Sequence, residues 1–376
     1  MTDAQRWHLR RKIPDGYRSP LRELDVVAAK VLYARKLDTA EDIRAFLEAR
    51  ADAHNPLDLA DMGAAVERLL RALHEGERIV VYGDYDADGV SATALLSSAL
   101  RDLGAQVRAY IPDRFEESYG LNTPALMRLR DEGAQLVVTV DCGVRSFREV
   151  ADARAVGLDM IITDHHSIPR ELPPAAAIIN PKREDSAYPF RELAGVGVAY
   201  RLVQALVGES GAALDPSSYL DLVALGTVAD IVPLVEDNRA LAIAGLERMR
   251  TAPRPGIRAL LEKSGVRPSL ADGETIAFRL GPRINAAGRL ENAGLAYRLL
   301  MAETLDEAQP LAAQLNGLNA ERQRLLEEQF QRACSLLPAE PDKLHLVDDP
   351  AFHEGIVGLV ASRLTGAFYR PSLVMR

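Results

Sequence analysis

Short apolar runs alternate with helical patterns through the middle of the chain. The runs are rich in Val and Ile and predict buried strands, and the segments between them carry apolar residues at helical spacing. Strands that alternate with helices predict βαβ units, whose parallel sheet is covered by helices on both faces. The predicted strands are 78–83, 106–111, 136–140, 160–163 and 176–179, and the predicted helices between them are 91–103, 124–132 and 145–156.

The pattern changes after the last of these strands. Residues 196–250 read as helices, and polar residues 304–337 read as one long connecting helix, with Pro310 expected in its first turn. From residue 343 a second α/β pattern begins, with strands at 344–347 and 372–375 around a helix at 355–364. We therefore predict an α/β protein in four parts. These are an N-terminal region (1–54), a parallel-sheet domain with flanking helices and a helical part (55–303), the connecting helix (304–337) and the incomplete start of a second, smaller α/β domain (338–376).

The composition excludes several classes of protein. The 376 residues include 45 Lys and Arg against 54 Asp and Glu, a net charge of −9, with 48% hydrophobic residues, which is ordinary for a globular protein. Cys142 and Cys334 are the only cysteines, so a disulfide framework is excluded and a cytoplasmic location is expected. The longest apolar stretch, 219–235, is interrupted by Asp221 and Asp230, so no membrane segment is expected.

The first 22 residues form a short basic segment, with six Lys and Arg against two Asp. Such a segment suits a nucleic-acid-binding arm, but a solvated tail that packs through Trp7 is the interpretation we favour, because short basic clusters are common.

Three carboxylates follow the first predicted strand at alternate positions. In the segment 83–89 (GDYDADG), Asp84, Asp86 and Asp88 would repel one another unless a cation neutralised them. A calcium loop of the EF-hand type needs a Glu at its twelfth position, and here Leu95 stands there, so that interpretation fails. A solvated turn with one capping Asp is the simpler alternative. Ligands bind at the strand-to-helix edge of parallel sheets, which favours a metal site.

Three more acidic motifs follow predicted apolar segments. Asp141 ends one strand, Asp164-His165-His166 ends the next, and Asp230 lies within a later apolar segment where an unpaired charge would be costly. Each motif taken alone could have an ordinary structural role. Because the motifs recur at the ends of successive strands and helices, one shared site is favoured. Carboxylates with an imidazole suit Mn²⁺ or Mg²⁺, and two such ions ~3.5–4 Å apart would promote phosphodiester or phosphoanhydride hydrolysis.

These motifs resemble the DHH phosphoesterase superfamily. Longer segments, 111–121 (IPDRFEESYGL) and 281–290 (GPRINAAGRL), resemble its RecJ branch of single-strand-specific 5′→3′ exonucleases of bacterial repair and recombination. Segment 353–364 (HEGIVGLVASRL) resembles the opening of that family's second, substrate-holding domain. Members of the branch continue into the rest of that domain and an oligonucleotide-binding barrel, so we expect a C-terminally truncated member.

The resemblance assigns a role to individual residues. Asp86, Asp88, Asp141, His165 and Asp230 are the expected metal ligands. The expected catalytic residues beside them are Asp84 and His166; the latter would either orient a ligand or donate a proton to the departing oxygen. The expected substrate-binding residues are Arg114, Tyr119, Arg283, Asn285, Arg289, His353 and Gly355. Intramolecular ion pairs are the alternative role for Arg283 and Arg289.

The resemblance also implies cofactors and partners. It implies two divalent cations, Mn²⁺ or Mg²⁺, a single-stranded DNA substrate, and a helicase and a single-strand-binding protein as candidate partners of a monomer. Two alternatives stay open: another DHH phosphoesterase that cleaves nano-RNA or cyclic dinucleotides, and a catalytically dead DHH-like replication scaffold. The first alternative usually begins its first motif with a His-Asn-Pro-Asp-like run, and the second usually lacks metal ligands. This chain has YGDYD at 82–86 and retains every expected acid.

Overall fold

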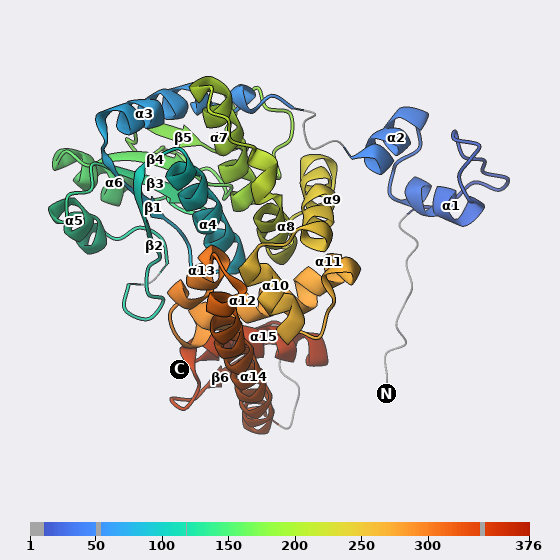
Figure 1. Ribbon diagram of the computed structural model, residues 1–376. Coiled ribbons are helices and arrows are strands. Elements are labelled where there is room, and N and C mark those ends of the chain that lie inside the picture. Colours follow the sequence, from blue (N-terminus) through green and yellow to red (C-terminus); the bar gives the residue numbers. More distant parts are fainter. Residues whose placement is uncertain (1–10, 50–53, 118, 339–342) are drawn as a thin grey trace.

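A five-stranded parallel sheet organises the larger part of the molecule (Figure 1). The computed structural model describes residues 11–49, 54–117, 119–338 and 343–376. The strand order is β2-β1-β3-β4-β5, and every neighbouring pair is parallel, which confirms the predicted sheet. The strands are β1 (Arg78–Tyr82), β2 (Gln106–Tyr110), β3 (Leu136–Val140), β4 (Asp159–Thr163) and β5 (Ala177–Ile179).

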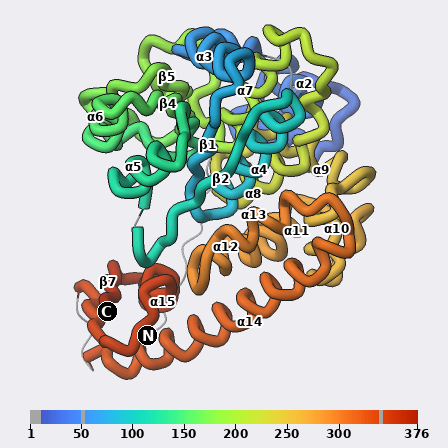
Figure 2. Tube along the Cα trace, turned by 60° about the vertical axis from the view of Figure 1, so that its left-hand side comes forward, coloured from blue at the N-terminus to red at the C-terminus, as the bar shows by residue number. Residues whose placement is uncertain are grey.

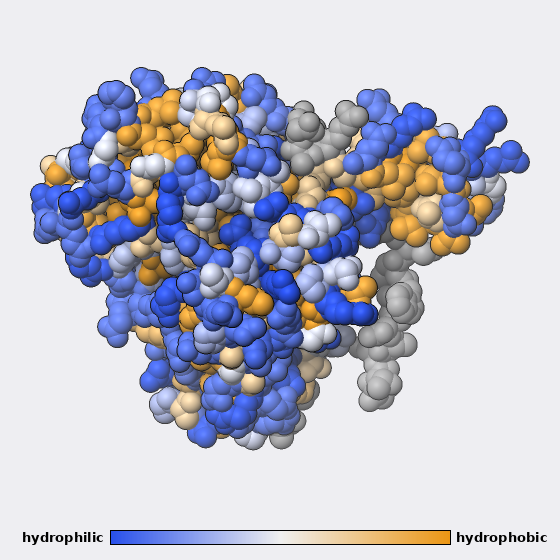
Figure 3. Space-filling view, viewed as in Figure 1, coloured by the Kyte–Doolittle hydropathy of each residue, from blue (hydrophilic) through white to orange (hydrophobic). Residues whose placement is uncertain are grey.

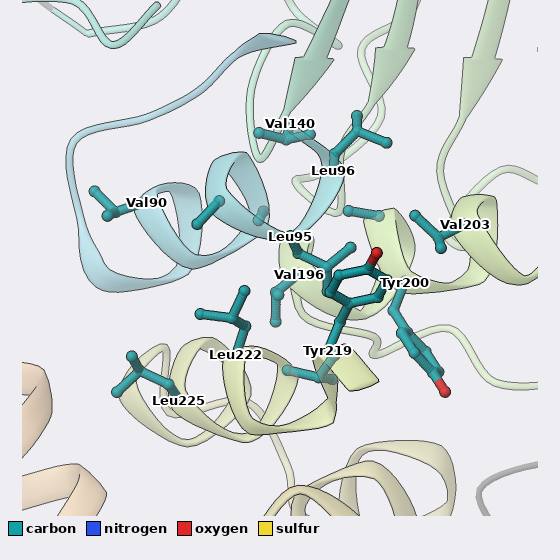
Figure 4. Packing of buried hydrophobic residues seen from close by; sticks show 14 of the residues in the cluster. Val90, Leu95, Leu96, Val140, Val196, Tyr200, Val203, Tyr219, Leu222 and Leu225 are labelled. Carbon is teal, nitrogen blue, oxygen red and sulfur yellow. The ribbon is translucent and has the colours of Figure 1, made fainter. Parts of the chain in front are cut away.

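Helices cover both faces of the sheet, as the apolar strands require. Along β1, Ile79 and Val81 belong to one hydrophobic core, and Val80 and Tyr82 belong to another on the opposite face. The helices of the first core include α3 (Met62–Glu75), α4 (Ala87–Asp102) and α7 (Gly195–Ser210), and those of the second are α5 (Thr123–Asp131) and α6 (Phe147–Ala155). Figure 4 shows part of the first core, where side chains of α4, α7 and α8 (Leu220–Ala229) pack together.

A helical part extends the first core away from the sheet. Its helices are α9 (Glu236–Thr251), α10 (Pro255–Lys263), α11 (Gly273–Thr275), α12 (Gly281–Leu290) and α13 (Gly294–Met301), and a π-helical turn, Ile276–Leu280, leads directly into α12. Short 3-10 turns lie at Pro56–Asp58, Pro216–Tyr219 and Pro268–Leu270. This part ends in the 32-residue helix α14 (Leu305–Leu336), along which α10, α12 and α13 pack.

Several helices differ from the sequence prediction in their bounds, and two differences have a clear physical consequence or cause. Helix α4 begins at Ala87 rather than at residue 91, because the Asp86 carboxylate caps it by accepting hydrogen bonds from the backbone N–H groups of Asp88 and Gly89. Pro310 is not in the first turn of α14 but is the sixth residue of the helix, where its missing N–H removes one backbone hydrogen bond.

A small second unit follows α14 (Figure 2). Strands β6 (His345–Asp348) and β7 (Ser372–Met375) pair in parallel around α15 (Glu354–Phe368). Its core joins Val347, Ile356 and Val360 to Ala333 near the end of α14, so the connecting helix is also part of this unit. None of the described helices combines the length and apolarity that crossing a bilayer requires.

The N-terminal region contains two short helices, α1 (Val26–Ala34) and α2 (Ala40–Glu48), with a small core of their own. The region contacts the main domain at α9, where Arg239 Nε donates to the Phe46 carbonyl oxygen at 2.8 Å. Arg11 pairs with Asp38 at 2.8 Å. Trp7, expected to anchor the tail, lies outside the described residues.

Candidate metal centre

The acidic motifs converge at the carboxyl edge of the sheet. Asp84, Asp86 and Asp88 follow β1, and Asp141 follows β3 directly. Asp164-His165-His166 follows β4, and Asp230 caps the C-terminus of α8. Parallel strands bring their carboxyl ends to one edge, and residues that are up to 146 positions apart (84 to 230) meet there.

Ligand-type atoms lie close enough to share cations. Three groups each have their candidate atoms within 4.8 Å of one another: Asp84, Asp86 and Asp141; Asp88, His165 and Asp230; and Asp141, His165 and His166. His165 connects the groups, because its Nε2 lies 3.0 Å from Asp141 Oδ1 and 3.7 Å from Asp230 Oδ2. The groups overlap, which is the arrangement expected when two neighbouring cations share ligands.

Backbone N–H groups hold the carboxylates of Asp88 and Asp86. Asp88 Oδ2 accepts from the Gly195 N–H at 2.7 Å, and Oδ1 accepts from the Val196 N–H at 2.9 Å, both at the start of α7. The positive end of that helix stabilises the buried charge. Asp86 Oδ1 accepts hydrogen bonds from backbone N–H groups at the start of α4. The N-termini of α4 and α7 therefore hold the carboxylates that follow β1.

Asp164 is the residue of this site that sequence reasoning left without a role. It is 1% exposed. Its Oδ1 accepts hydrogen bonds from the backbone N–H groups of His165 and His166 and lies 2.7 Å from Nδ1 of His166, while its Oδ2 accepts from the Val144 N–H. Asp164 therefore orients the His166 ring and holds the backbone of both histidines. The available signal was an acid directly after a buried strand and before a His pair.

Burial and mutual repulsion shift the acids towards their protonated forms. Burial, reinforced by the Asp86 charge, raises the pKa of Asp84 to about 8 and that of Asp230 to about 6. Burial and neighbouring carboxylates also raise the pKa values of Asp88 and Asp141. Without a cation, the cluster is costly to ionise.

The two histidines differ in protonation. Burial and the neighbouring His166 lower the pKa of His165 to about 4, so its ring is neutral and able to ligate a metal. The hydrogen bond to Asp164 raises the pKa of His166, whose side chain is 44% exposed. His165 therefore suits ligation, and His166 suits proton transfer.

The donor set fits divalent cations. Asp84 Oδ1 is buried and accepts no hydrogen bond from the described residues, and Asp141 Oδ1 is buried with His165 Nε2 3.0 Å away but not in hydrogen-bonding geometry. Unpaired buried carboxylate oxygens are expensive, and hard cations such as Mg²⁺ and Mn²⁺ prefer oxygen ligands with an occasional imidazole. Asp86, Asp88, Asp141, His165 and Asp230 would hold such ions, with Asp84 beside them.

Comparison with known proteins agrees with this geometry. The model of the DHH family, N-terminal domain, matches residues 78–227. The single-stranded-DNA-specific exonuclease RecJ of Bacillus subtilis is 42% identical over 380 residues, covering 100% of this chain and 48% of the relative. A crystal structure of exonuclease RecJ bound to manganese is 39% identical with a TM-score of 0.77, covering 84% of this chain and 80% of that one. The chain belongs to the RecJ branch of the DHH family.

A second RecJ structure extends the match. RecJ from Thermus thermophilus in complex with Mn²⁺ is 35% identical with a TM-score of 0.78, covering 92% of this chain and 50% of that one. The chain thus spans about half the length of the Bacillus subtilis RecJ and half of the Thermus thermophilus chain. The fold class predicted from the sequence is confirmed.

Two of the predicted substrate-binding residues of this RecJ-branch chain lie next to the metal centre. Arg114 stacks over the Tyr85 ring, with its guanidinium carbon 4.9 Å from the ring centroid. Tyr119 is 53% exposed, and its ring meets those of His166 and Tyr85 edge-on at 6.2 Å. Both side chains lie over the Asp-rich loop, so contact with substrate stays a prediction that the geometry allows.

The other predicted substrate-binding residues make contacts within the fold. Asn285 Oδ1 accepts from the Ala87 N–H at 2.7 Å, which ties α12 to the start of α4. Arg289 donates to the Gly355 carbonyl oxygen at 3.2 Å, and a Cβ on Gly355 would lie 2.0 Å from the Arg289 oxygen. The ring of His353, which caps α15, meets that of Phe115 edge-on at 5.7 Å. Gly355 therefore has a packing reason to be glycine.

Arg283 and Arg289 do not form the intramolecular ion pairs considered as their alternative role. Neither guanidinium lies within 4.0 Å of a carboxylate among the described residues. Arg283 donates instead to the Asn316 side chain at 3.1 Å and to the Arg279 carbonyl oxygen at 2.7 Å. No carboxylate of the described residues therefore neutralises either arginine.

Proposed function

We propose that the chain hydrolyses phosphodiester bonds of single-stranded DNA, from a 5′ end, with two divalent cations. The observation that carries this proposal is the cluster of carboxylates and a neutral imidazole at one sheet edge, in which the buried Asp84 Oδ1 accepts no hydrogen bond from any residue that the structure describes. Bound Mn²⁺ or Mg²⁺ would polarise the phosphate and lower the pKa of an attacking water.

The chain's own residues supply positioning and proton transfer. Asp88 and Asp141 are held by α7 and by the strand end, so they present fixed oxygens without rearrangement. His166 is fixed through Nδ1 by Asp164, and its Nε2 is the atom available to give a proton to the departing oxygen. Arg114, next to this loop, would bind a phosphate that the cations do not reach.

The relatives support the choice of substrate and metal. The curated relatives are named single-stranded-DNA-specific exonucleases, and the matching RecJ structures are complexes with Mn²⁺ or Mg²⁺. The proposal has further parts. They are digestion in the 5′→3′ direction, a role in repair and recombination, action as a monomer in the cytoplasm, and cooperation with a helicase and a single-strand-binding protein.

One observation bears on the alternatives. A catalytically dead scaffold would not need to retain the complete set of acids, and in this chain all the expected ligands are present and brought together. Another DHH phosphoesterase, acting on nano-RNA or cyclic dinucleotides, remains the second candidate, because the metal centre alone does not set substrate length.

Digestion assays separate these functions. The chain is incubated with Mn²⁺ or Mg²⁺ and with 5′-labelled single strands, circular single strands, blunt duplex, dinucleotides or pyrophosphate. We expect mononucleotides released from the 5′ end of linear single strands, no attack on circles or blunt duplex, and no activity of Asp141→Asn. Cleavage of dinucleotides only would select the second candidate, and inactivity on every substrate would contradict hydrolysis itself.

A further inference from the structure

Five arginines on or near α12 have no carboxylate partner among the residues that the structure describes. Among the described residues, Arg114, Arg279, Arg283, Arg289 and Arg322 have no Asp or Glu oxygen within 4.0 Å. Most of these side chains are half-buried, and only Arg279 is exposed. Positive charges gathered out of water without counter-ions are costly, because each loses hydration and repels the others. Such an arrangement indicates a site for an anion.

Arg322, like Arg279, lies outside the motifs that the sequence analysis marked. It lies on the connecting helix α14, and its Nε donates to the Asn319 side chain at 3.2 Å. Arg324, two residues further on, is fully occupied by Glu321 and Glu328 on the exposed side of the same helix. The two arginines on this helix therefore differ in their charge partners: carboxylates neutralise Arg324, and no described carboxylate neutralises Arg322.

Helix α14, which carries Arg322, packs along α12 (Figure 2). The Arg322 charge lowers the pKa values of both Arg283 and Arg289, after the larger effect of burial. Burial lowers the pKa of Arg322 as well. Arg283 is oriented by Asn316 of α14 and by the Arg279 carbonyl oxygen, so groups that carry no charge position this guanidinium.

Helix α12 connects this group to the metal centre. Near its start, a Cβ on Gly281 would lie 3.2 Å from the Ala229 Cβ, and Ala229 directly precedes Asp230. Near its end, a Cβ on Gly288 would lie 2.5 Å from the Tyr85 carbonyl oxygen, beside Asp86. Helix α12, which carries Arg283 and Arg289, therefore packs beside the proposed metal ligands near both of its ends, and α14 packs along it as well. In Figure 3 the region of α14 is mostly hydrophilic on the face shown.

We propose that Arg322, together with Arg283 and Arg279, binds a backbone phosphate of the nucleic-acid strand whose scissile bond lies at the metal centre. The proposal rests on the proposed function and names a substrate contact within it. The planar guanidinium fork matches phosphate oxygens and needs no base identity, as a sequence-independent nuclease requires. The connecting helix is then part of the substrate site as well as a link between domains.

Binding measurements with Arg322→Ala and the matched control Arg324→Ala test this contact. A fluorescent single-stranded oligonucleotide is titrated in EDTA, so that no hydrolysis occurs, over a series of salt concentrations. We expect Arg322→Ala to raise Kd about tenfold, the effect of one lost charge-assisted contact. We also expect it to flatten the slope of log K against log[salt] by about 0.7, the value for one phosphate of a single strand. The control should change neither quantity by more than about twofold.

Two further measurements make the result decisive. Arg322→Lys keeps the charge but loses the fork, so it should fall between the parent and Arg322→Ala; it also serves as the test if the alanine variant does not fold, as judged by circular dichroism. Hydrolysis of bis(p-nitrophenyl) phosphate reports the metal centre without a strand, and Arg322→Ala should lower the rate on a single-stranded oligonucleotide more than the rate on this small diester.

The outcomes separate the two proposals. Equal Kd values and equal salt slopes for the Arg322 and Arg324 variants would overturn the phosphate contact while leaving hydrolysis intact. A parent chain that hydrolyses neither the small diester nor DNA would overturn the proposed function, and the EDTA titration would still decide whether Arg322 binds the strand.

Discussion

Replacing Asp84 by Asn should stabilise the metal-free protein. Asp84 is 4% exposed, its Oδ1 accepts no hydrogen bond from the described residues, and its pKa is raised to about 8 by burial and by Asp86. Asn has nearly the same shape but no charge, so Asp84→Asn removes the electrostatic cost and keeps the packing. The same substitution removes an oxygen from the proposed metal centre, so its effect should reverse when metal is present.

The size of the effect follows from proton linkage. The carboxyl group has a pKa of about 8 in the folded state and ~3.9 in the unfolded state. The free energy of unfolding is therefore highest below about pH 4, where the group is protonated in both states, and it falls as pH rises from about 4 to 8. At pH 7 the loss is about 4 kcal/mol, at 1.36 kcal/mol per pH unit. Because Asp88 and Asp141 share the same repulsion, we expect Asp84→Asn to recover only about 1 to 3 kcal/mol.

Urea unfolding in EDTA from pH 5 to 8 measures this directly. The parent's free energy of unfolding should fall over this range, and that of Asp84→Asn should fall less steeply and exceed the parent's at pH 7.5. Adding Mn²⁺ should stabilise the parent more than the variant. Asp131→Asn, at a 67% exposed side chain, is the control and should change stability by less than about 0.5 kcal/mol. A variant less stable than the parent in EDTA at pH 7.5 would refute the argument that burial and repulsion among the carboxylates destabilise the metal-free fold.

Three other substitutions or labels test neighbouring features. Asp164→Ala should destabilise the metal-free fold by about 3 kcal/mol in urea unfolding, because four nitrogen atoms lie within hydrogen-bonding distance of the buried carboxylate; a loss below about 1 kcal/mol would contradict that role. Iodoacetamide should modify Cys334 and spare Cys142 in the folded chain, since Cys142 is 1% exposed and burial raises the pKa of its thiol; mass spectrometry of peptides reads the result. Gly355→Ala should loosen α15 from α12, detected as faster amide exchange there, because the new Cβ would lie 2.0 Å from the Arg289 oxygen.

The strands and the acids that follow them could be predicted because both depend on local sequence. Val-rich runs predict buried parallel strands, and an Asp directly after such a run must lie at the carboxyl edge. Strand β3 (Leu136–Val140) has the predicted bounds, and β7 (Ser372–Met375) does as well. The sequence predicts the start of α4 four residues too late, because capping by one Asp and metal binding were weighed as alternatives, whereas Asp86 caps the helix within the proposed metal site.

Contacts between distant segments could not be predicted in this way. Nothing local to Asn285 indicates that its side chain accepts a hydrogen bond from Ala87, which is 198 residues away. Likewise, Arg322 and Arg324 have the same side chain on the same predicted helix, and only the packing of α12 distinguishes the one without a carboxylate partner from the one paired with Glu321 and Glu328.

The glycines around the metal centre explain why its carboxylates cannot relax away from one another. A Cβ on Gly195 would lie 2.7 Å from Asp141 Oδ1, and a Cβ on Gly226 would lie 2.6 Å from Asp88 Oδ1. Helices α7 and α8 therefore press their backbones directly against the acids, and no side chain there can move to make room. The electrostatic strain is built into the packing of the fold, so a bound cation relieves a repulsion that protonation alone would otherwise have to remove. From the sequence alone, these two glycines are predicted only to weaken apolar helices. Their role depends on an acid that lies 54 or 138 positions earlier in the chain.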